Sequence, residues 1–66
     1  MKITINGEAF ETEKSGTITE LLDELNTDPG RVAVEINLSI VRRSDYPVFK
    51  LHEGDRIEIV NFVGGG

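Results

Sequence analysis

The sequence predicts an α+β domain in which one amphipathic helix covers one face of a β-sheet. Two alternating segments joined by Asn6-Gly7 predict an N-terminal hairpin, and a stretch after Thr17 has the apolar spacing of a helix. Further alternating segments follow the helix. One helix needs one sheet face to pack against, which gives a two-layer architecture. With 66 residues, the chain has room for one small domain.

The N-terminal hairpin is defined by its turn. Residues 1–5 alternate apolar and polar side chains, and Asn6-Gly7 is typical of a two-residue turn in which both positions have positive φ. A turn of this length fixes the register, with Ile5 opposite Glu8 and Ile3 opposite Phe10. The second strand is expected over residues 8–13.

The helix is predicted from its start signal and its apolar face. Thr17 and Glu20 have the spacing of a capping box, in which each side chain accepts a hydrogen bond from the other residue's backbone. One face then carries Ile18, Leu21, Leu22 and Leu25. We expect the helix to end near Asn26, which tolerates a left-handed backbone. Its acidic residues, Glu20, Asp23 and Glu24, are interpreted as solvent-facing.

The rest of the chain reads as three strands and their connections. Residues 32–36 alternate strictly, residues 40–41 form a short edge strand after a tight connection at 37–39, and a last strand begins at Arg56. Apolar cover for the sheet is expected from Val48, Phe49 and Leu51.

Composition excludes several classes of partner and site. Twelve acidic against seven basic residues give a net charge of −5, which disfavours nucleic acid and anionic membrane surfaces. The chain has no cysteine, so it forms no disulfide or thiolate metal site, in keeping with the reducing cytoplasm. No apolar run approaches the roughly 20 residues of a membrane helix. The single histidine, His52, is interpreted as a surface turn residue and not as a metal ligand.

The end of the last strand breaks the expected alternation. Val60 and Phe62 fall on the face that carries Arg56 and Glu58, which should be polar if only one sheet face is buried. Two interpretations are open. A loop such as residues 46–51 folds over Val60 and Phe62, or the two side chains form an exposed apolar patch on which a partner docks.

The C-terminal glycines predict a flexible tail over residues 64–66, following a folded domain over residues 1–63. An arm without Cβ atoms can enter a narrow channel, and three residues span about 10 Å. The α-carboxylate of Gly66 is ionised at neutral pH and is a nucleophile toward an activated phosphorus atom. The alternative is a frayed end without function.

The order of several segments resembles the ThiS family, the sulfur carriers of thiamine biosynthesis. The resemblance covers the whole chain and rests on Met1–Glu8, Thr17–Leu22, Arg31–Asn37, Ile40–Val41, Glu53–Ile59 and Phe62–Gly66, which includes the terminal diglycine. It implies a ubiquitin-like β-grasp fold, with a mixed sheet of four to five strands packed on one main helix.

The resemblance also implies a function in thiazole formation. A ThiF-type enzyme would use ATP and Mg²⁺ to adenylate the Gly66 carboxylate, and sulfur relayed by a desulfurase would convert it to a thiocarboxylate. A ThiG-type thiazole synthase would then take the sulfur. The chain would bind no cofactor of its own. Gly64 and Gly65 would form the arm, and partners would dock on Val60, Phe62 and Val63.

Other functions are compatible with the same tail. The chain could serve molybdopterin synthesis as a sulfur carrier, or act as a ubiquitin-like modifier. It could also be a small β-grasp interaction module whose tail is inert, which deletion of the tail would distinguish. An enzyme in its own right is not expected, because the sequence offers no nucleophile–base pair and no metal cluster.

Overall fold

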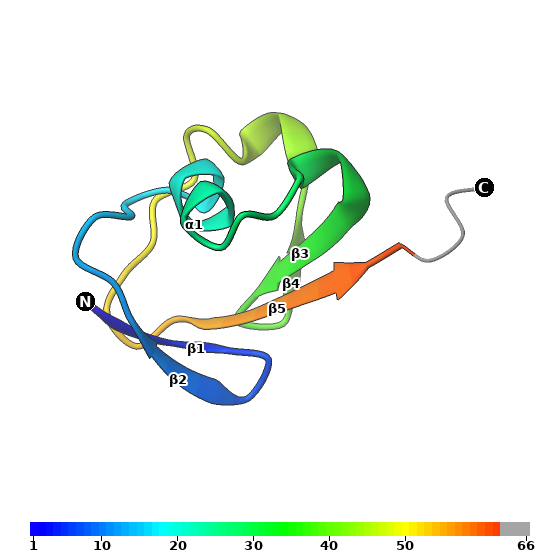
Figure 1. Ribbon diagram of the computed structural model, residues 1–66. Coiled ribbons are helices and arrows are strands. Elements are labelled where there is room, and N and C mark those ends of the chain that lie inside the picture. The colour runs from blue at the N-terminus through cyan, green and yellow to red at the C-terminus, as the bar shows by residue number, and fades with distance from the viewer. Residues whose placement is uncertain (63–66) are drawn as a thin grey trace.

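A five-stranded mixed sheet forms the framework of the protein, of which the computed structural model describes residues 1–62. The strand order is β2-β1-β5-β3-β4. The elements are β1 (Lys2–Ile5), β2 (Glu8–Glu11), α1 (Ile18–Glu24), a 3-10 helix (Pro29–Arg31), β3 (Val32–Ile36), β4 (Ser39–Val41), a second 3-10 helix (Arg43–Asp45) and β5 (Arg56–Asn61). Strands β1 and β5 run parallel and the other pairs are antiparallel, which Figure 1 lets the reader follow.

The first hairpin confirms the predicted turn and register. Asn6 and Gly7 have φ of 49° and 84°, and Ile3 and Ile5 lie opposite Phe10 and Glu8. Strand β2, however, ends at Glu11 and not at Glu13. The chain turns at Thr12, whose buried hydroxyl accepts hydrogen bonds from the backbone N–H groups of Lys14 and Ser15. The hydroxyl therefore accepts hydrogen bonds from backbone N–H groups that would otherwise need strand partners.

Helix α1 begins at the predicted capping box. The Thr17 hydroxyl accepts from the N–H of Glu20 at 3.2 Å, and the Glu20 carboxylate accepts from the N–H groups of Thr17 and Gly16 at 3.1 and 2.7 Å. The helix has Leu25 as its C-cap, and Asn26 follows with a left-handed φ of 55°. Both ends of this short helix are thus fixed by local sequence.

A second two-residue turn joins β3 to β4. Asn37 and Leu38 both have positive φ, at 52° and 74°, and Ile36 lies directly opposite Ser39. Asparagine tolerates this backbone, whereas leucine is disfavoured there because its Cβ approaches the following carbonyl. The Leu38 side chain is also 90% exposed. The turn therefore carries an apolar residue that no other part of residues 1–62 covers.

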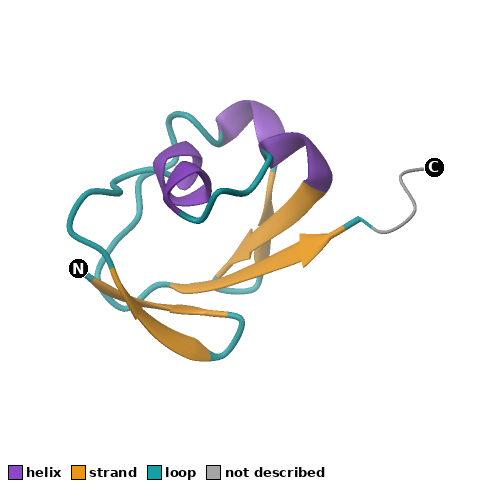
Figure 2. Ribbon diagram, viewed as in Figure 1, coloured by secondary structure: helices purple, strands orange, loops and turns teal. Residues whose placement is uncertain are grey.

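The hydrophobic core lies between α1 and one face of the sheet. The buried apolar residues are Ile3, Ile18, Leu21, Leu22, Val32, Val34, Ile36, Val41, Tyr46, Leu51 and Ile57. Figure 2 shows that α1 and both 3-10 helices lie on this side of the sheet. Of the predicted cover, Leu51 is buried and Phe49 packs against the core, but Val48 is 70% exposed, so its predicted role is wrong. Tyr46, two residues before Val48 in the chain, is buried and covers the sheet instead of Val48.

Candidate functional site

The predicted docking residues lie at the end of the central strand. β5 lies between β1 and β3. Val60 lies in this strand and Phe62 directly follows it, and each side chain is 55% exposed. The N–H of Phe62 donates to the carbonyl of Arg31 at 2.9 Å. This bond extends the antiparallel pairing of β5 with β3 by one residue, into the segment before β3. The interpretation in which a loop buries these two side chains is therefore wrong. We call Val60 and Phe62 the tail root.

A side chain from the first hairpin holds the last half of β5 in place. The β1–β5 pairing ends at Ile5 opposite Ile57. Beyond it, the Asn6 side chain accepts from the N–H of Ile59 at 2.8 Å and donates to the carbonyl of the same residue at 3.2 Å. The amide group thus acts as one further residue of β1, and it fixes the strand immediately before the tail root.

The tail root belongs to a larger surface, the sheet face opposite α1, which we call the outer face. The register places Ala33 opposite Val60 and Glu35 opposite both Glu58 and Ile40. Ile40 is 76% exposed. Sequence reasoning did not single out Ile40, although its position next to the inward-facing Val41 in an edge strand indicates an outward side chain.

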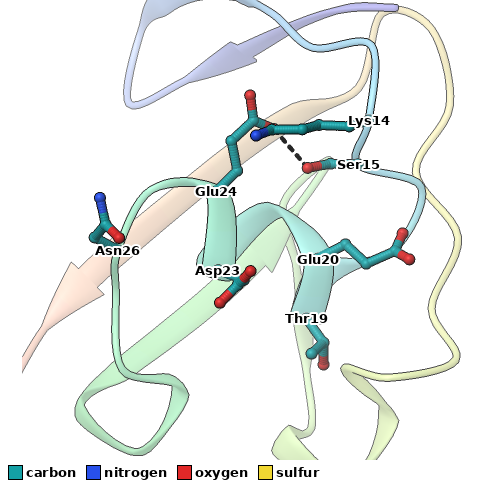
Figure 3. Close-up of a pocket in the computed structure, with 7 residues that line it drawn as sticks. All are labelled: Lys14, Ser15, Thr19, Glu20, Asp23, Glu24 and Asn26. Atoms are coloured by element: carbon teal, nitrogen blue, oxygen red, sulfur yellow. Dashed lines mark hydrogen bonds between the residues drawn. The ribbon is translucent and has the colours of Figure 1, made fainter.

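The helix side of the molecule carries a separate hollow of about 540 Å³, lined by Lys14, Ser15, Thr19, Glu20, Asp23, Glu24 and Asn26. Figure 3 shows the hydrogen bond between Ser15 and Glu24 in this hollow. Val60 and Phe62, the predicted site residues within the described range, do not line it. Glu24 is not simply solvent-facing, because its carboxylate accepts from the hydroxyls of Ser15 and Thr12 at 2.6 and 2.7 Å. These bonds lower the pKa of Glu24 from its ordinary value, and the charge of Lys14 lowers it further.

The four remaining predicted site residues, Val63, Gly64, Gly65 and Gly66, lie outside the described residues. Among residues 1–62, no group of three or more His, Asp or Glu side chains could hold a metal ion. None of the helices in that range is long and apolar enough to cross a membrane. His52 lies at the surface, and its ring is 4.0 Å from the carboxylate of Asp55.

Comparisons with known proteins agree with one another. The model of the ThiS family matches residues 3–66. The sulfur carrier protein ThiS of Bacillus subtilis is 38% identical over 65 residues, covering 97% of this chain and 98% of that protein. A thiazole synthase of Paramagnetospirillum magneticum is 48% identical over 66 residues, and this chain spans only 20% of its length. The crystal structure of a thiamine biosynthesis protein (ThiS) from Geobacter metallireducens covers the whole chain with a TM-score of 0.84 and 30% identity.

The hairpin, helix and three further strands in one mixed sheet define a ubiquitin-like β-grasp protein, as the resemblance implied. Within that class, the chain belongs to the ThiS family.

Proposed function

We propose that this chain carries sulfur for thiazole formation in thiamine biosynthesis, on the α-carboxylate of Gly66. The observation that carries the proposal is the family match over residues 3–66, which includes the diglycine, together with a relative named as a sulfur carrier that aligns over nearly its whole length. We assign the activity to the cytoplasm, a compartment compatible with a chain that has no cysteine.

The chemistry begins at the carboxylate. A ThiF-type enzyme binds ATP with Mg²⁺, and a carboxylate oxygen of Gly66 attacks the α-phosphorus, which releases pyrophosphate and leaves an acyl-adenylate. A desulfurase takes sulfur from cysteine as an enzyme persulfide, whose terminal sulfur attacks the carbonyl carbon and displaces AMP. A thiol then reduces the S–S bond of the resulting acyl disulfide and is itself oxidised to a disulfide. The product is a thiocarboxylate, which a ThiG-type thiazole synthase accepts as its sulfur source. In this scheme the chain is a co-substrate, holds no cofactor and contributes no catalytic side chain.

The exposed tail root supports this division of roles. A partner must hold the folded domain while the arm enters its active site, and Val60 and Phe62 lie immediately before Val63 and the glycines. Both side chains remain half exposed at the end of a strand that is hydrogen-bonded on both edges. We therefore propose Val60, Phe62 and Val63 as docking residues, and Gly64 and Gly65 as the arm that fits a narrow channel.

A second arrangement of the same chemistry is favoured by one comparison. The thiazole synthase of Paramagnetospirillum magneticum is 48% identical to this chain over a fifth of its length. A segment similar to this chain thus occurs within a polypeptide named a thiazole synthase, and we infer that this domain works in a similar longer chain as the alternative. In that case further residues would follow Gly66, and its carboxylate would be free only after cleavage.

Intact-mass analysis tests the proposal. The protein, incubated with the adenylating enzyme, ATP, Mg²⁺ and a sulfur source, is expected to gain the mass of one sulfur-for-oxygen exchange at Gly66. Deletion of Gly66 or the substitution Gly65→Val should abolish the gain, because the first removes the reacting group and the second adds a branched side chain to the arm. Val48→Ala, which changes an exposed side chain outside the tail, should react normally.

Two results would contradict the proposal. One is a gain of sulfur by the chain without Gly66. The other is sulfur-loaded protein from the native host whose mass includes further residues after Gly66.

A further inference from the structure

The turn of the first hairpin contains a chemically labile pair of residues. Asparagine is thermolabile because the backbone nitrogen of the next residue can attack its side-chain amide carbon and close a cyclic imide, a succinimide. Glycine in the next position favours this reaction, since it has no Cβ to hinder the approach. The chain has four asparagines, and glycine follows only Asn6, whereas threonine, leucine and phenylalanine follow Asn26, Asn37 and Asn61.

The attacking nitrogen, that of Gly7, is accessible. Asn6 and Gly7 are both exposed. Apart from the adjacent residues, no described atom lies within 4 Å of the position that a Cβ of Gly7 would take. No backbone carbonyl of residues 1–62 accepts a hydrogen bond from the Gly7 N–H. Water can therefore reach this nitrogen and take its proton.

The amide group of Asn6, in contrast, is held on both of its polar atoms. Its oxygen accepts from the N–H of Ile59 at 2.8 Å, and its nitrogen donates to the carbonyl of Ile59 at 3.2 Å. Ring closure requires the amide carbon to rotate toward Gly7, and the nitrogen that leaves is the one that donates to Ile59. Both hydrogen bonds therefore oppose the reaction.

Release of the amide group needs only a local opening. The pairing of β1 with β5 ends at Ile5 opposite Ile57, so the Asn6 side chain is the contact of the hairpin with Ile59. Separation of these two residues frees the amide while the core stays folded. Openings of this size have lower free energies than global unfolding.

We propose that Asn6-Gly7 is a modification site, at which Asn6 deamidates when the end of β5 moves away from the turn. The Gly7 nitrogen loses its proton to water and bonds to Cγ of Asn6, whose bond to Nδ2 breaks, and the amide nitrogen leaves as ammonia. Water then opens the succinimide. Attack at Cγ gives aspartate, and attack at the main-chain carbonyl carbon gives isoaspartate. Water is the co-reactant, and no oxidation or reduction takes place.

The two products differ in their effect on the fold. Aspartate keeps an oxygen that accepts from the N–H of Ile59. Isoaspartate adds a carbon atom to the main chain inside the two-residue turn, and so alters the register that places Ile5 opposite Glu8. Either product lacks the donor to the Ile59 carbonyl. The modified protein, above all its isoaspartate form, therefore holds β5 less firmly just before the tail root.

Asn37 provides a matched comparison within the same molecule. It occupies the same position in the second two-residue turn, with a φ of 52° against 49° for Asn6. Its amide group is also held on both atoms, by the N–H of Arg56 at 3.0 Å and the carboxylate of Asp55 at 3.1 Å. The next residue, however, is Leu38, whose side chain hinders ring closure. The difference in rate between the two asparagines therefore reports the effect of glycine.

Peptide mapping by mass spectrometry tests the site. The purified full chain is kept in neutral buffer for several weeks, digested and examined for the mass change from amide to acid. Isoaspartate is detected with a protein-isoaspartate methyltransferase and S-adenosylmethionine as the methyl donor. Asn6 should react about tenfold faster than Asn37, because glycine leaves the approach open. Leu38→Gly should raise the rate at Asn37 and leave that at Asn6 unchanged. Equal rates at Asn6 and Asn37 in the unsubstituted chain would overturn the inference.

Hydrogen exchange tests the local opening, because the Ile59 amide proton is bonded to the Asn6 oxygen. Deamidation of Asn6 in the folded protein, relative to protein unfolded in guanidinium chloride, should be slowed by the same factor as exchange at the Ile59 amide. Equal deamidation rates in the folded and unfolded protein would overturn protection by Ile59. Deamidation slowed to the level of the most protected core amides would show that global unfolding is required, and would overturn the local opening. Neither experiment depends on sulfur transfer.

Discussion

Single residues of this protein connect segments that the sequence alone leaves separate, and Glu24 is the clearest case. Its Oε1 atom accepts hydrogen bonds from Ser15 and Thr12, both of which are buried. The Thr12 hydroxyl in turn accepts from two backbone N–H groups of the following loop. One helical carboxylate therefore anchors the connection between the first hairpin and α1, and the anchor depends on the carboxylate being ionised.

This dependence predicts a pH effect on stability. The hydroxyl bonds lower the pKa of Glu24 in the folded state below its ordinary value of 4.5, so the stabilisation is fully present above that value. It is lost as the pH falls through the lowered pKa. Glu24→Gln should therefore destabilise the protein at about pH 7 and less at a pH well below 4.5, measured by urea unfolding. Glu8→Gln, at an exposed position in β2, serves as the control. An equal loss at both pH values would argue against the assignment.

At the scale of elements, the first hairpin supports β5 as well as itself. The Asn6 side chain makes two hydrogen bonds to the backbone of Ile59, in the part of β5 that β1 is too short to pair. Asn6 therefore has two roles: it adopts the left-handed backbone of the turn, and its side-chain amide binds the backbone of β5.

Asn6→Gly should reveal the second role, because glycine keeps the turn and removes the amide. We expect a loss of about 1 kcal/mol in the free energy of unfolding. We also expect faster hydrogen exchange at the Ile59 amide, measured by NMR. Asn6→Asp retains the acceptor oxygen and should preserve most of the protection. Unchanged exchange at Ile59 in the glycine variant would contradict this role.

Elements with local causes could be predicted from the sequence. The Asn6-Gly7 turn and the capping box of Thr17 and Glu20 depend on residues within four positions of one another, and both are confirmed. The end of β2 was not predicted. The Thr12 hydroxyl accepts from the N–H groups of Lys14 and Ser15, and the contact with Glu24 that holds this hydroxyl depends on the tertiary fold. Val48 was assigned wrongly for the same reason, since apolar composition does not say which side chain of a loop turns inward.

The candidate site was predictable only in part. The alternation of β5 identified Val60 and Phe62 as apolar residues on a polar face, but whether a loop covers them depends on tertiary structure. Leu38 and Ile40 were not identified, because each is ordinary in sequence and only the turn geometry and the strand register show them exposed on the outer face. The roles of Val63, Gly64, Gly65 and Gly66 stay predictions.

The whole molecule has one covered and one open sheet face, and this division separates stability from recognition. Side chains of the covered face pack in the core with those of α1, whereas Val60, Phe62 and Ile40 are exposed and contribute little to it. Substitutions on the outer face should therefore alter partner binding while leaving folding nearly unchanged.

Phe62→Asp tests this separation. Because the Phe62 side chain is 55% exposed, the change should alter the free energy of unfolding by less than about 1 kcal/mol. It should nevertheless slow adenylation about tenfold at limiting protein, by placing a charge in an apolar contact. Rates of pyrophosphate release by the adenylating enzyme give the measurement. Val48→Asp is the comparison, and normal rates for Phe62→Asp would refute docking at the tail root.

The central position of β5 has a mechanical consequence. A pull applied beyond Phe62 acts along the length of this strand, which is bonded to β1 on one edge and to β3 on the other. The bonds of the antiparallel ladder lie across the direction of the force, so they bear the load together and do not open one after another. We therefore expect that the arm can be pulled out of a narrow channel without unfolding the domain to which it is attached.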